Sequence, residues 1–326
     1  MTSMPSPSTE MWRRVGAHIA AGESFAIVRR PDGAAHIFDT PLDTDAPTPE
    51  GPYFRISPWD EGSRHYLPTS REDYAARLGA LIRSFGPNLR KVVFSRTTCG
   101  RIAPDTIVEK ASKYFVRFPE ALCFLYYTPA TGFWLGASPE LLLKSENGGR
   151  FSTMALAGTR LADGDGPWDK KNSEEHAYVV DFIETAFRDA GLIPETGDRA
   201  TLRFGRIEHL CTRISAKGDD SAFRNLLERL DPTPALCGTP RDAAREAISR
   251  FEAHKRGCYG GYIEFRMPRS ETREAYVNLR CARIDRDGHW CVFSGGGIIE
   301  SSVVDDEWLE SERKAEALVS ILEDRQ

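Results

Sequence analysis

The chain has 326 residues, of which 40% are hydrophobic and 28% are charged, and its formal net charge at pH 7 is −5. This length can bury one large hydrophobic core or two medium ones. The negative charge and the lack of a long basic block argue against a nucleic-acid-binding surface. No apolar run reaches the roughly 18 residues that a membrane span needs, so we expect no membrane partner.

The seven cysteines are scattered singly along the chain, and no C-x-x-C pair occurs. Their odd number and their spacing argue against both a disulfide framework and a cysteine zinc site. The first residues, MTSMPSPSTEMWRR, lack the apolar stretch of a secretory signal. We therefore expect a soluble protein of the reducing cytoplasm.

The elements expected in chain order begin with a loop at 39–52, which is rich in Pro, Asp and Thr. A helix with a Ser/Glu start follows at 70–85. Two further segments have helical patterns, at 172–191 and 305–325. Segments rich in β-branched and aromatic residues predict strands. These strands are 90–96, 121–129, 132–138, 257–265, 274–284 and 289–296.

The order of these elements indicates the fold class. The last strands follow each other with short turns, such as DRDGH at 285–289, which predicts antiparallel pairing. The strict alternation of strand and helix that builds a doubly wound parallel sheet is absent. We expect one α/β domain with antiparallel sheets and helices packed outside.

In the last helix, charged residues near its start lie on the same face as the apolar residues further along. Glu307, Glu310 and Lys314 follow the spacing i, i+3, i+7, and Leu318 and Ile321 continue the same stripe. Carboxylates on a buried face need a cation or a metal as partner. The alternative is a capped, solvated helix start with a Glu310–Lys314 pair.

The helix at 172–191 repeats this pattern. Glu175 begins a stripe that Val179, Phe182 and Ala186 continue at helical spacing. Glu175 is therefore a second candidate for a buried, partnered carboxylate. The alternative is local, because Asn172 followed by Glu175 has the spacing of a capping box.

Two further residues are candidates for acid–base chemistry. In the strand at 90–96, Lys91 shares a face with Val93 and Ser95. A buried lysine there could act as a base, whereas an ordinary one would lie at an edge or on the surface. Glu140 precedes an apolar run, where a raised pKa would suit an acid. The alternative is a glutamate in the first turn of a helix.

Arg280 and two glycine-containing segments could hold an anion. Arg280 alternates with Leu279 and Cys281 in the strand at 274–284, so it is either a carboxylate ligand or a surface arginine. The segments ALAGTR and SGGG offer backbone N–H groups to an anion. Neither segment fits a nucleotide-binding motif. A base, an acid, three carboxylates and an anion clamp together suit a small polyanionic substrate with magnesium.

Ten motifs occur together in one order: KVVFSR, GASPELLL, ALAGTR, NSEEHAYVV, IEHLCTRISA, LDPTPALCGTPRDAA, GCYGGYIEF, VNLRCARI, FSGGGII and EWLESERK. In these motifs the chain resembles the chorismate-utilising enzymes, and most closely the isochorismate synthases of menaquinone and siderophore pathways. The resemblance covers 88–322. It implies two packed antiparallel sheets flanked by outer helices, the fold of anthranilate synthase component I. We expect a single catalytic domain, 1–326, in which 1–87 is a shortened N-terminal part.

The resemblance also implies roles for individual residues. Lys91 matches the lysine that activates water for attack at C2 of chorismate, and Glu140 matches the acid that protonates the departing C4 hydroxyl. Glu175, Glu307 and Glu310 match the glutamates that bind Mg²⁺, which holds the ring carboxylate. The matching substrate-binding residues are Gly158, Thr159, His209, Ala235, Leu236, Tyr259, Arg280, Gly295, Gly297 and Lys314.

Several reactions share this scaffold, and two features favour water as the nucleophile. The chain has Lys91, and it has ALCGTPRDAA where the ammonia-using members carry an SGAPK-like segment. We therefore expect no glutaminase subunit. We also expect a monomer, because related enzymes are often monomeric and no exposed heptad or apolar helix demands a partner. Ala235 and Leu236 favour release of isochorismate over a salicylate synthase, which would eliminate pyruvate. A siderophore-pathway enzyme and an inactive chorismate-binding protein remain alternatives, and the compact length favours menaquinone synthesis.

Overall fold

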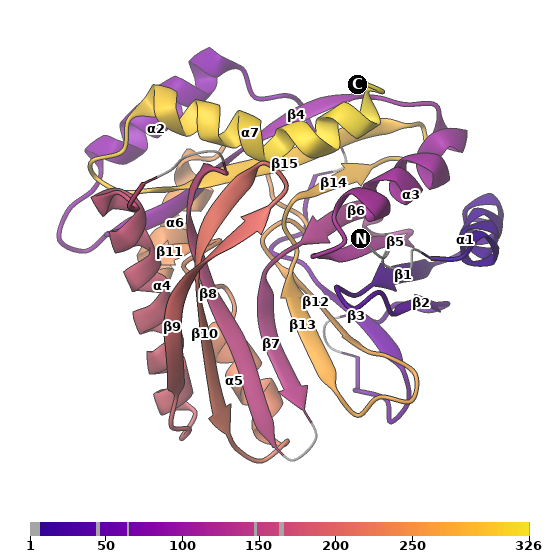
Figure 1. Ribbon diagram of the computed structural model, residues 1–326. Helices are drawn as coiled ribbons and strands as arrows, with labels where there is room; N and C mark the ends of the chain where they lie inside the picture. The colour runs from indigo at the N-terminus through magenta and orange to yellow at the C-terminus, as the bar shows by residue number, and fades with distance from the viewer. Residues whose placement is uncertain (1–6, 44–45, 64, 147–148, 163–165, 326) are drawn as a thin grey trace.

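The computed structural model describes residues 7–43, 46–63, 65–146, 149–162 and 166–325. Two antiparallel sheets form its framework (Figure 1). In order, the first sheet contains β11 (Gly238–Thr239), β4 (Lys91–Arg101), β15 (His289–Ile298), β14 (Cys281–Ile284), β6 (Gly132–Ser138), β5 (Leu122–Thr128), β1 (Phe25–Arg29) and β2 (Ala35–Phe38). The second contains β3 (Tyr53–Ser57), β12 (Tyr262–Arg266), β13 (Arg273–Val277), β7 (Leu141–Glu146), β8 (Arg150–Leu161), β10 (Ile207–Lys217) and β9 (Glu195–Phe204).

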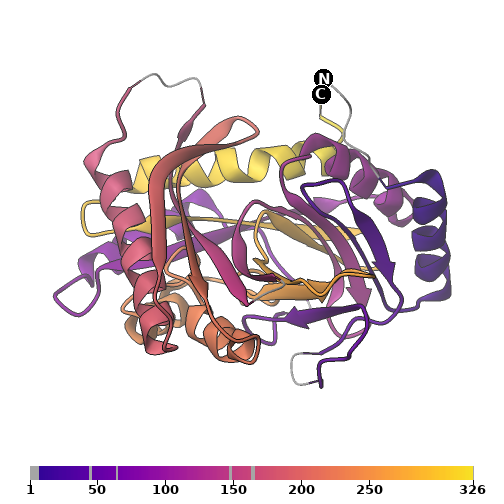
Figure 2. The same ribbon diagram turned by 60° about the horizontal axis from the view of Figure 1, so that its bottom comes forward.

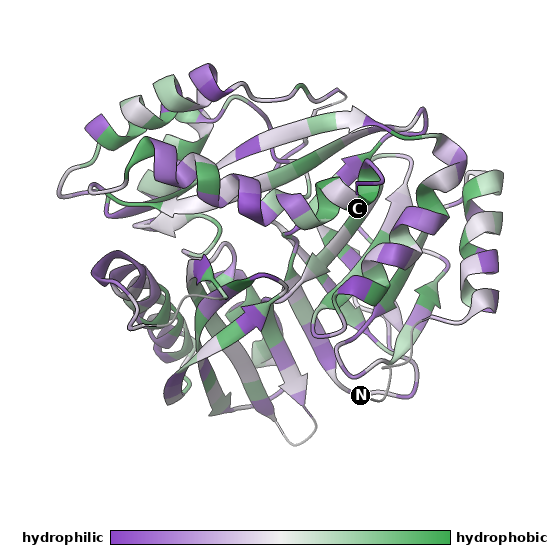
Figure 3. Ribbon diagram, turned by 45° about the horizontal axis from the view of Figure 1, so that its top comes forward, coloured by the Kyte–Doolittle hydropathy of each residue, from purple (hydrophilic) through white to green (hydrophobic). Residues whose placement is uncertain are grey.

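Helices cover the outside of this framework. Helix α7 lies along β15, and α4 packs against β8 and β10 (Figures 1 and 2). Hydrophilic and hydrophobic residues alternate along the outer helices, as amphipathic packing requires (Figure 3). No described helix is long and apolar enough to cross a membrane. The helices are α1 (Thr9–Ala21), α2 (Arg71–Arg83), α3 (Ile107–Arg117), α4 (Lys170–Asp189), α5 (Ala222–Leu230), α6 (Arg241–Phe251) and α7 (Val304–Leu322), with a 3-10 turn at Pro104–Thr106.

Strand β5 shows how the sequence specifies these layers. Phe124 and Tyr126 point into the apolar core between the two sheets. Cys123 and Leu125 point the other way, into a second core under α1, α3 and α7. Because alternate side chains of a strand face opposite sides, a strand buried on both faces is apolar throughout. The expected class, antiparallel sheets with helices outside, is therefore confirmed.

Three local expectations differ from the structure. The expected strand 274–284 is two strands in different sheets, since the chain turns at Arg280, whose φ of 50° is left-handed. The strand expected at 289–296 extends to 298, so all three glycines of SGGG lie inside β15. Asp169 caps α4 by accepting from the Asn172 N–H, so the Asn172–Glu175 capping box does not form.

The N-terminal part contributes to both sheets. Residues before 88 supply β1 and β2 to one sheet and β3 to the other. Within the loop expected at 39–52, the described residues form no strand or helix, apart from an isolated bridge between Leu42 and Arg55; residues 44 and 45 lie outside the described part. The described residues before 88 are thus integrated into the framework.

Candidate active site

The site forms at two neighbouring connections between the sheets. One connection joins β6 to β7, and the other joins β13 to β14. Ser138 ends β6, and Glu140 immediately precedes β7. The second crossing joins β13 to β14 through Arg280. The two crossings are tied together, because Ser138 Oγ donates to the Val277 carbonyl (2.7 Å) and the Val277 N–H donates to the Glu140 carbonyl (3.2 Å).

The second crossing also leaves the glycine-containing end of β15 without a described strand neighbour on one side. Strand β14 pairs with β15 only as far as Val292. Beyond that point, β15 pairs with β4 alone among the described strands, through 298. One edge of 295–297 therefore has no strand neighbour, and these glycines line a pocket. Of the residues expected at the site, the pocket is lined by Glu140, Gly158, Thr159, Glu175, His209, Ala235, Leu236, Tyr259, Arg280, Gly295, Gly297 and Lys314.

Glu140 has the environment of an acid. Its side chain is buried, with 3% exposure. Burial raises its pKa to about 8, although the charge of Lys91 and a hydrogen bond from Thr233 act in the opposite direction. The carboxyl group is therefore mainly protonated at neutral pH and can donate a proton. Because Glu140 lies outside any helix, the first-turn alternative is wrong.

Lys91 is fully buried at the start of β4, so it is not a surface lysine. Its Nζ lies 3.0 Å from Oε1 of Glu175 on α4. The pair lacks hydrogen-bond geometry, and Lys91 Nζ has no hydrogen-bond partner within the described part of the chain. A buried lysine nitrogen that is ion-paired but makes no hydrogen bond is costly, which indicates that this position has a use beyond folding.

Glu307 and Glu310 do not line the pocket themselves, but their carboxylates lie beside Gly296, which does. Burial, followed by the charge of Glu310, raises the pKa of Glu307 to about 7. Burial acts to raise the pKa of Glu310 as well, but Lys314 and Lys171 outweigh it and hold the pKa below its ordinary value. The solvated helix start is therefore wrong for Glu307, which is only 1% exposed, while the Glu310–Lys314 pair does form.

Each of the three expected metal ligands has a lysine partner. The nitrogen–oxygen separations are 3.0 Å for Lys91–Glu175, 2.6 Å for Lys171–Glu307 and 2.6 Å for Lys314–Glu310. Among the described residues, these three glutamates do not form a group whose ligand atoms all lie within 4.8 Å. Three lysines thus neutralise carboxylates that would otherwise repel one another.

Two features of these glutamates fit a bound cation. Glu307 Oε2 is buried and has no hydrogen-bond partner among the described residues. A Cβ at Gly296 would lie 2.9 Å from Glu307 Oε2, and one at Gly297 would lie 2.1 Å from Glu175 Oε1. The glycines therefore keep open the space that the carboxylates enter. Carboxylate oxygens are the ligands that Mg²⁺ prefers.

His209 orients Arg280. His209 Nδ1 lies 2.8 Å from the Gly158 carbonyl, and Arg280 Nη2 lies 2.9 Å from His209 Nε2. Burial, together with the charges of Arg280 and Lys314, lowers the pKa of His209 to about 3, so the ring is neutral. Nδ1 then carries the proton and donates to the carbonyl, and Nε2 accepts from the guanidinium group. His209 is a positioning residue in this arrangement.

Gly158 lies inside β8, where the pairing of this strand with β10 shifts its register. Its φ of 74° favours glycine, and a Cβ there would crowd Asn172 at 3.2 Å. The Thr159 N–H donates to Asn172 Oδ1 (2.8 Å). Across the pocket, the Tyr259 ring stacks on Phe293 with centroids 5.4 Å apart. The anion-clamp residues are thus held on rigid elements.

Sequence reasoning missed three residues with roles at the site. Lys171 pairs with Glu307, and Asn172 holds the Thr159 backbone. Thr233 donates a long hydrogen bond of 3.4 Å to Glu140 Oε1. Asn172 begins the motif that supplied Glu175, Lys171 directly precedes this motif, and Thr233 lies two residues before Ala235. Their proximity in sequence to expected residues was the available signal.

Comparison with known proteins now identifies the class. The model of the chorismate-binding enzyme family matches residues 69–323. The chain therefore belongs to the chorismate-binding enzyme family. Among curated relatives, isochorismate synthase MenF of Pasteurella multocida is 31% identical over 262 residues, or 73% of this chain and 58% of the relative. The salicylate biosynthesis isochorismate synthase of Pseudomonas aeruginosa is 32% identical over 244 residues, 70% of this chain and 50% of the relative.

Solved structures show the same fold. The menaquinone-specific isochorismate synthase MenF of Escherichia coli matches with a TM-score of 0.71 at 22% identity, covering 96% of this chain and 81% of that one. Anthranilate synthase component I of Streptococcus pneumoniae matches with a TM-score of 0.65 at 18% identity, covering 82% and 60%. The chain spans between half and two thirds of the length of the two curated relatives above.

Proposed function

We propose that the chain is an isochorismate synthase that converts chorismate to isochorismate reversibly with water as nucleophile. The observation that carries this proposal is that a buried lysine lies near enough to a buried, mainly protonated carboxyl group for its charge to act on the pKa of that group. Lys91 is fully buried, and its charge acts on Glu140, whose pKa is about 8. A buried lysine and a carboxyl group that can donate a proton supply the base and the acid that the exchange of one hydroxyl for another requires.

In the proposed reaction, the amine form of Lys91 is the base, and it accepts a proton from the water that attacks C2 of chorismate. The ring double bonds shift, and the C4 hydroxyl leaves with the proton that Glu140 donates. One water enters and one water leaves, so the reaction is an isomerisation. The ionised Glu140 and protonated Lys91 then return to their starting states by exchange with solvent or in the reverse reaction.

The substrate's two carboxylates have different proposed partners. Arg280, held by His209, would bind the enolpyruvyl carboxylate together with Tyr259 and the free edge of β15 at Gly295 and Gly297. The ring carboxylate would lie near Gly158, Thr159 and Lys314. Ala235 and Leu236 would form the apolar wall.

Glu175, Glu307 and Glu310 would hold Mg²⁺. When bound, the ion would neutralise these glutamates and fix the ring carboxylate of chorismate electrostatically. Support comes from the unpartnered Glu307 Oε2 and from the space at Gly296 and Gly297. The lysines that now pair with the glutamates would be released from them.

The test is product analysis. The purified chain is incubated with chorismate, with and without Mg²⁺ and ammonium, and the products are separated by chromatography. The proposal expects Mg²⁺-dependent isochorismate without pyruvate and without a glutaminase subunit. Salicylate plus pyruvate would favour the salicylate synthase, product only with ammonium would overturn the role of Lys91, and no product would favour an inactive binding protein.

We further propose menaquinone synthesis as the pathway. The support is the match to relatives named MenF, one of them described as menaquinone-specific. Other relatives serve 2,3-dihydroxybenzoate or salicylate production by name. Complementation of bacterial strains that lack either the menaquinone or the siderophore isochorismate synthase tests the assignment. Rescue of the siderophore strain alone would overturn it.

A further inference from the structure

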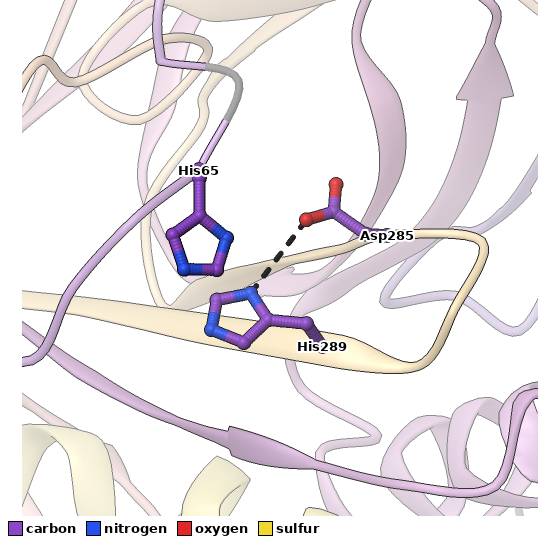
Figure 4. Close-up of side chains that lie close together, drawn as sticks. All are labelled: His65, Asp285 and His289. Atoms are coloured by element: carbon purple, nitrogen blue, oxygen red, sulfur yellow. Dashed lines mark ion pairs between the residues drawn. The ribbon is translucent and has the colours of Figure 1, made fainter.

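Three side chains of metal-ligand type meet outside the pocket. His65 comes from the segment between β3 and α2, and Asp285 and His289 lie at the two ends of the turn between β14 and β15 (Figure 4). One ligand atom of each lies within 4.8 Å of the others. Among the described residues, no other group of three or more His, Cys, Asp or Glu side chains has ligand atoms that all lie this close together.

We propose that His65, Asp285 and His289 bind a divalent transition-metal ion of the Zn²⁺ class. Zinc, cobalt and nickel ions bind a ligand set of two imidazoles and one carboxylate, whereas Mg²⁺ prefers oxygen ligands alone. The site would therefore differ in metal preference from the three glutamates of the pocket. None of its three residues lines that pocket.

The geometry needs only a small adjustment. Ligand atoms held about 2.0–2.2 Å from a tetrahedral zinc ion lie roughly 3.3–3.6 Å from one another. His289 Nδ1 already lies 3.6 Å from Asp285 Oδ2. The rings of His65 and His289 are stacked, with centroids 4.5 Å apart. His65 is exposed, so its ring can turn to complete the site.

The other two ligands are held by the framework. Arg283 Nη2 lies 2.9 Å from Asp285 Oδ1, which leaves Oδ2 directed toward His289. The Asp285 N–H donates to the His289 carbonyl (2.7 Å), and this bond fixes the turn. Second-shell bonds of this kind orient metal ligands and are part of a built site.

The segment that carries His65 is also tied down locally. Ser63 Oγ donates to the His65 carbonyl (2.6 Å), and the Ser63 N–H donates to Tyr66 Oη (3.0 Å). The Arg283 guanidinium lies 5.4 Å from the centre of the Tyr66 ring. Arg283 therefore contacts both sides of the site. A bound ion would clip the segment before α2 to β15, the strand that continues into the pocket.

Metal binding by untagged, EDTA-treated protein tests the proposal directly. Titration with ZnCl₂ by calorimetry should give one Zn²⁺ per chain, with a melting temperature that rises with zinc concentration. Binding should survive millimolar Mg²⁺. Co²⁺ should give visible absorption bands of a nitrogen–oxygen site without the charge-transfer band of a thiolate.

Single variants assign the ligands. His65→Ala and His289→Ala should each weaken zinc binding at least tenfold, while His36→Ala, a half-buried histidine on β2, should not. His65 is exposed, so its variant should fold normally. Equal zinc affinity in wild type and both variants, or no binding by wild type, would overturn the proposal. So would a thiolate band, since the Sγ atoms of Cys99 and Cys291 lie 2.7 Å apart. This readout does not depend on any activity toward chorismate.

Discussion

Lys171 Nζ lies 2.6 Å from Glu307 Oε1, and this contact joins the start of α4 to the start of α7. Burial acts to lower the pKa of Lys171, but the charges of Glu307, Glu310 and Glu175 raise it above its usual value. One lysine thus responds to all three glutamates that we expect to hold Mg²⁺. Without a bound metal, the positive charge of Lys171 partly neutralises these glutamates.

This relationship predicts a metal-dependent stability defect. Without Mg²⁺, Lys171→Met should destabilise the fold by roughly 1–3 kcal/mol, less than the ~3–5 kcal/mol for breaking a fully buried pair, because the lysine side chain is partly exposed. With Mg²⁺, the defect should shrink, since the metal replaces the lost charge. Urea unfolding with and without Mg²⁺ measures both values. The neighbouring Lys170→Met is the control, because the Lys170 side chain is 88% exposed. A defect of equal size with and without Mg²⁺ would contradict the metal role of Glu307.

Glu140 predicts a pH dependence of both activity and stability. Its pKa rises from 4.5 to about 8 on folding, mainly through burial. The folded state therefore binds this proton more tightly, so the stabilisation is complete below pH 4.5 and is lost as the pH rises through about 8. Activity measured as kcat/KM should fall above the same pH, because the acid has lost its proton.

Glu140→Gln separates this group from the other titrating residues. The variant should lose roughly 10²–10⁴-fold in turnover, the typical contribution of general acid catalysis. Between pH 6 and pH 9, its free energy of unfolding should decline less than that of wild type. Urea unfolding at both pH values gives the comparison. Parallel declines would show that Glu140 does not titrate in this range.

Gly296 predicts a steric test of the carboxylate site. An alanine Cβ there would lie 2.9 Å from Glu307 Oε2 and 3.2 Å from Glu310 Oε1. Gly296→Ala should therefore displace the glutamates. The Mg²⁺ concentration needed for half-maximal activity should rise at least tenfold. Gly16→Ala on α1 is the control, because its Cβ would meet nothing within 4 Å. An unchanged Mg²⁺ titration for Gly296→Ala would count against a metal at this position.

Sequence patterns predicted the framework well because they reflect burial. The apolar runs at β5 and β6 and the helical stripe of α7 follow from which faces are covered. The resemblance supplied residues that the structure then brings to one pocket, such as Glu140 and Lys314. Lys91 lies just outside the lining, paired with Glu175.

What the sequence did not predict depends on long-range contacts. The break at Arg280 arises because neighbouring residues belong to different sheets, which the alternating pattern of 274–284 does not reveal. No local pattern separates Lys171 from the neighbouring Lys170, and only the contact between α4 and α7 distinguishes the two. The His65 cluster joins segments about 220 residues apart in sequence, beyond any local pattern.

Lys91 provides the most direct test of the chemistry. Lys91→Met keeps an apolar chain of similar length in a fully buried position, so the fold should survive better than with alanine. Water addition should fall by roughly 10²–10⁴-fold or more, since the base is gone. Chorismate should still bind, because the proposed anion ligands Arg280 and Lys314 remain. Calorimetric binding and chromatographic turnover, measured on one preparation, separate the two effects. Near-normal turnover by this variant would exclude Lys91 as the base, and loss of binding together with turnover would assign it to substrate or metal binding instead.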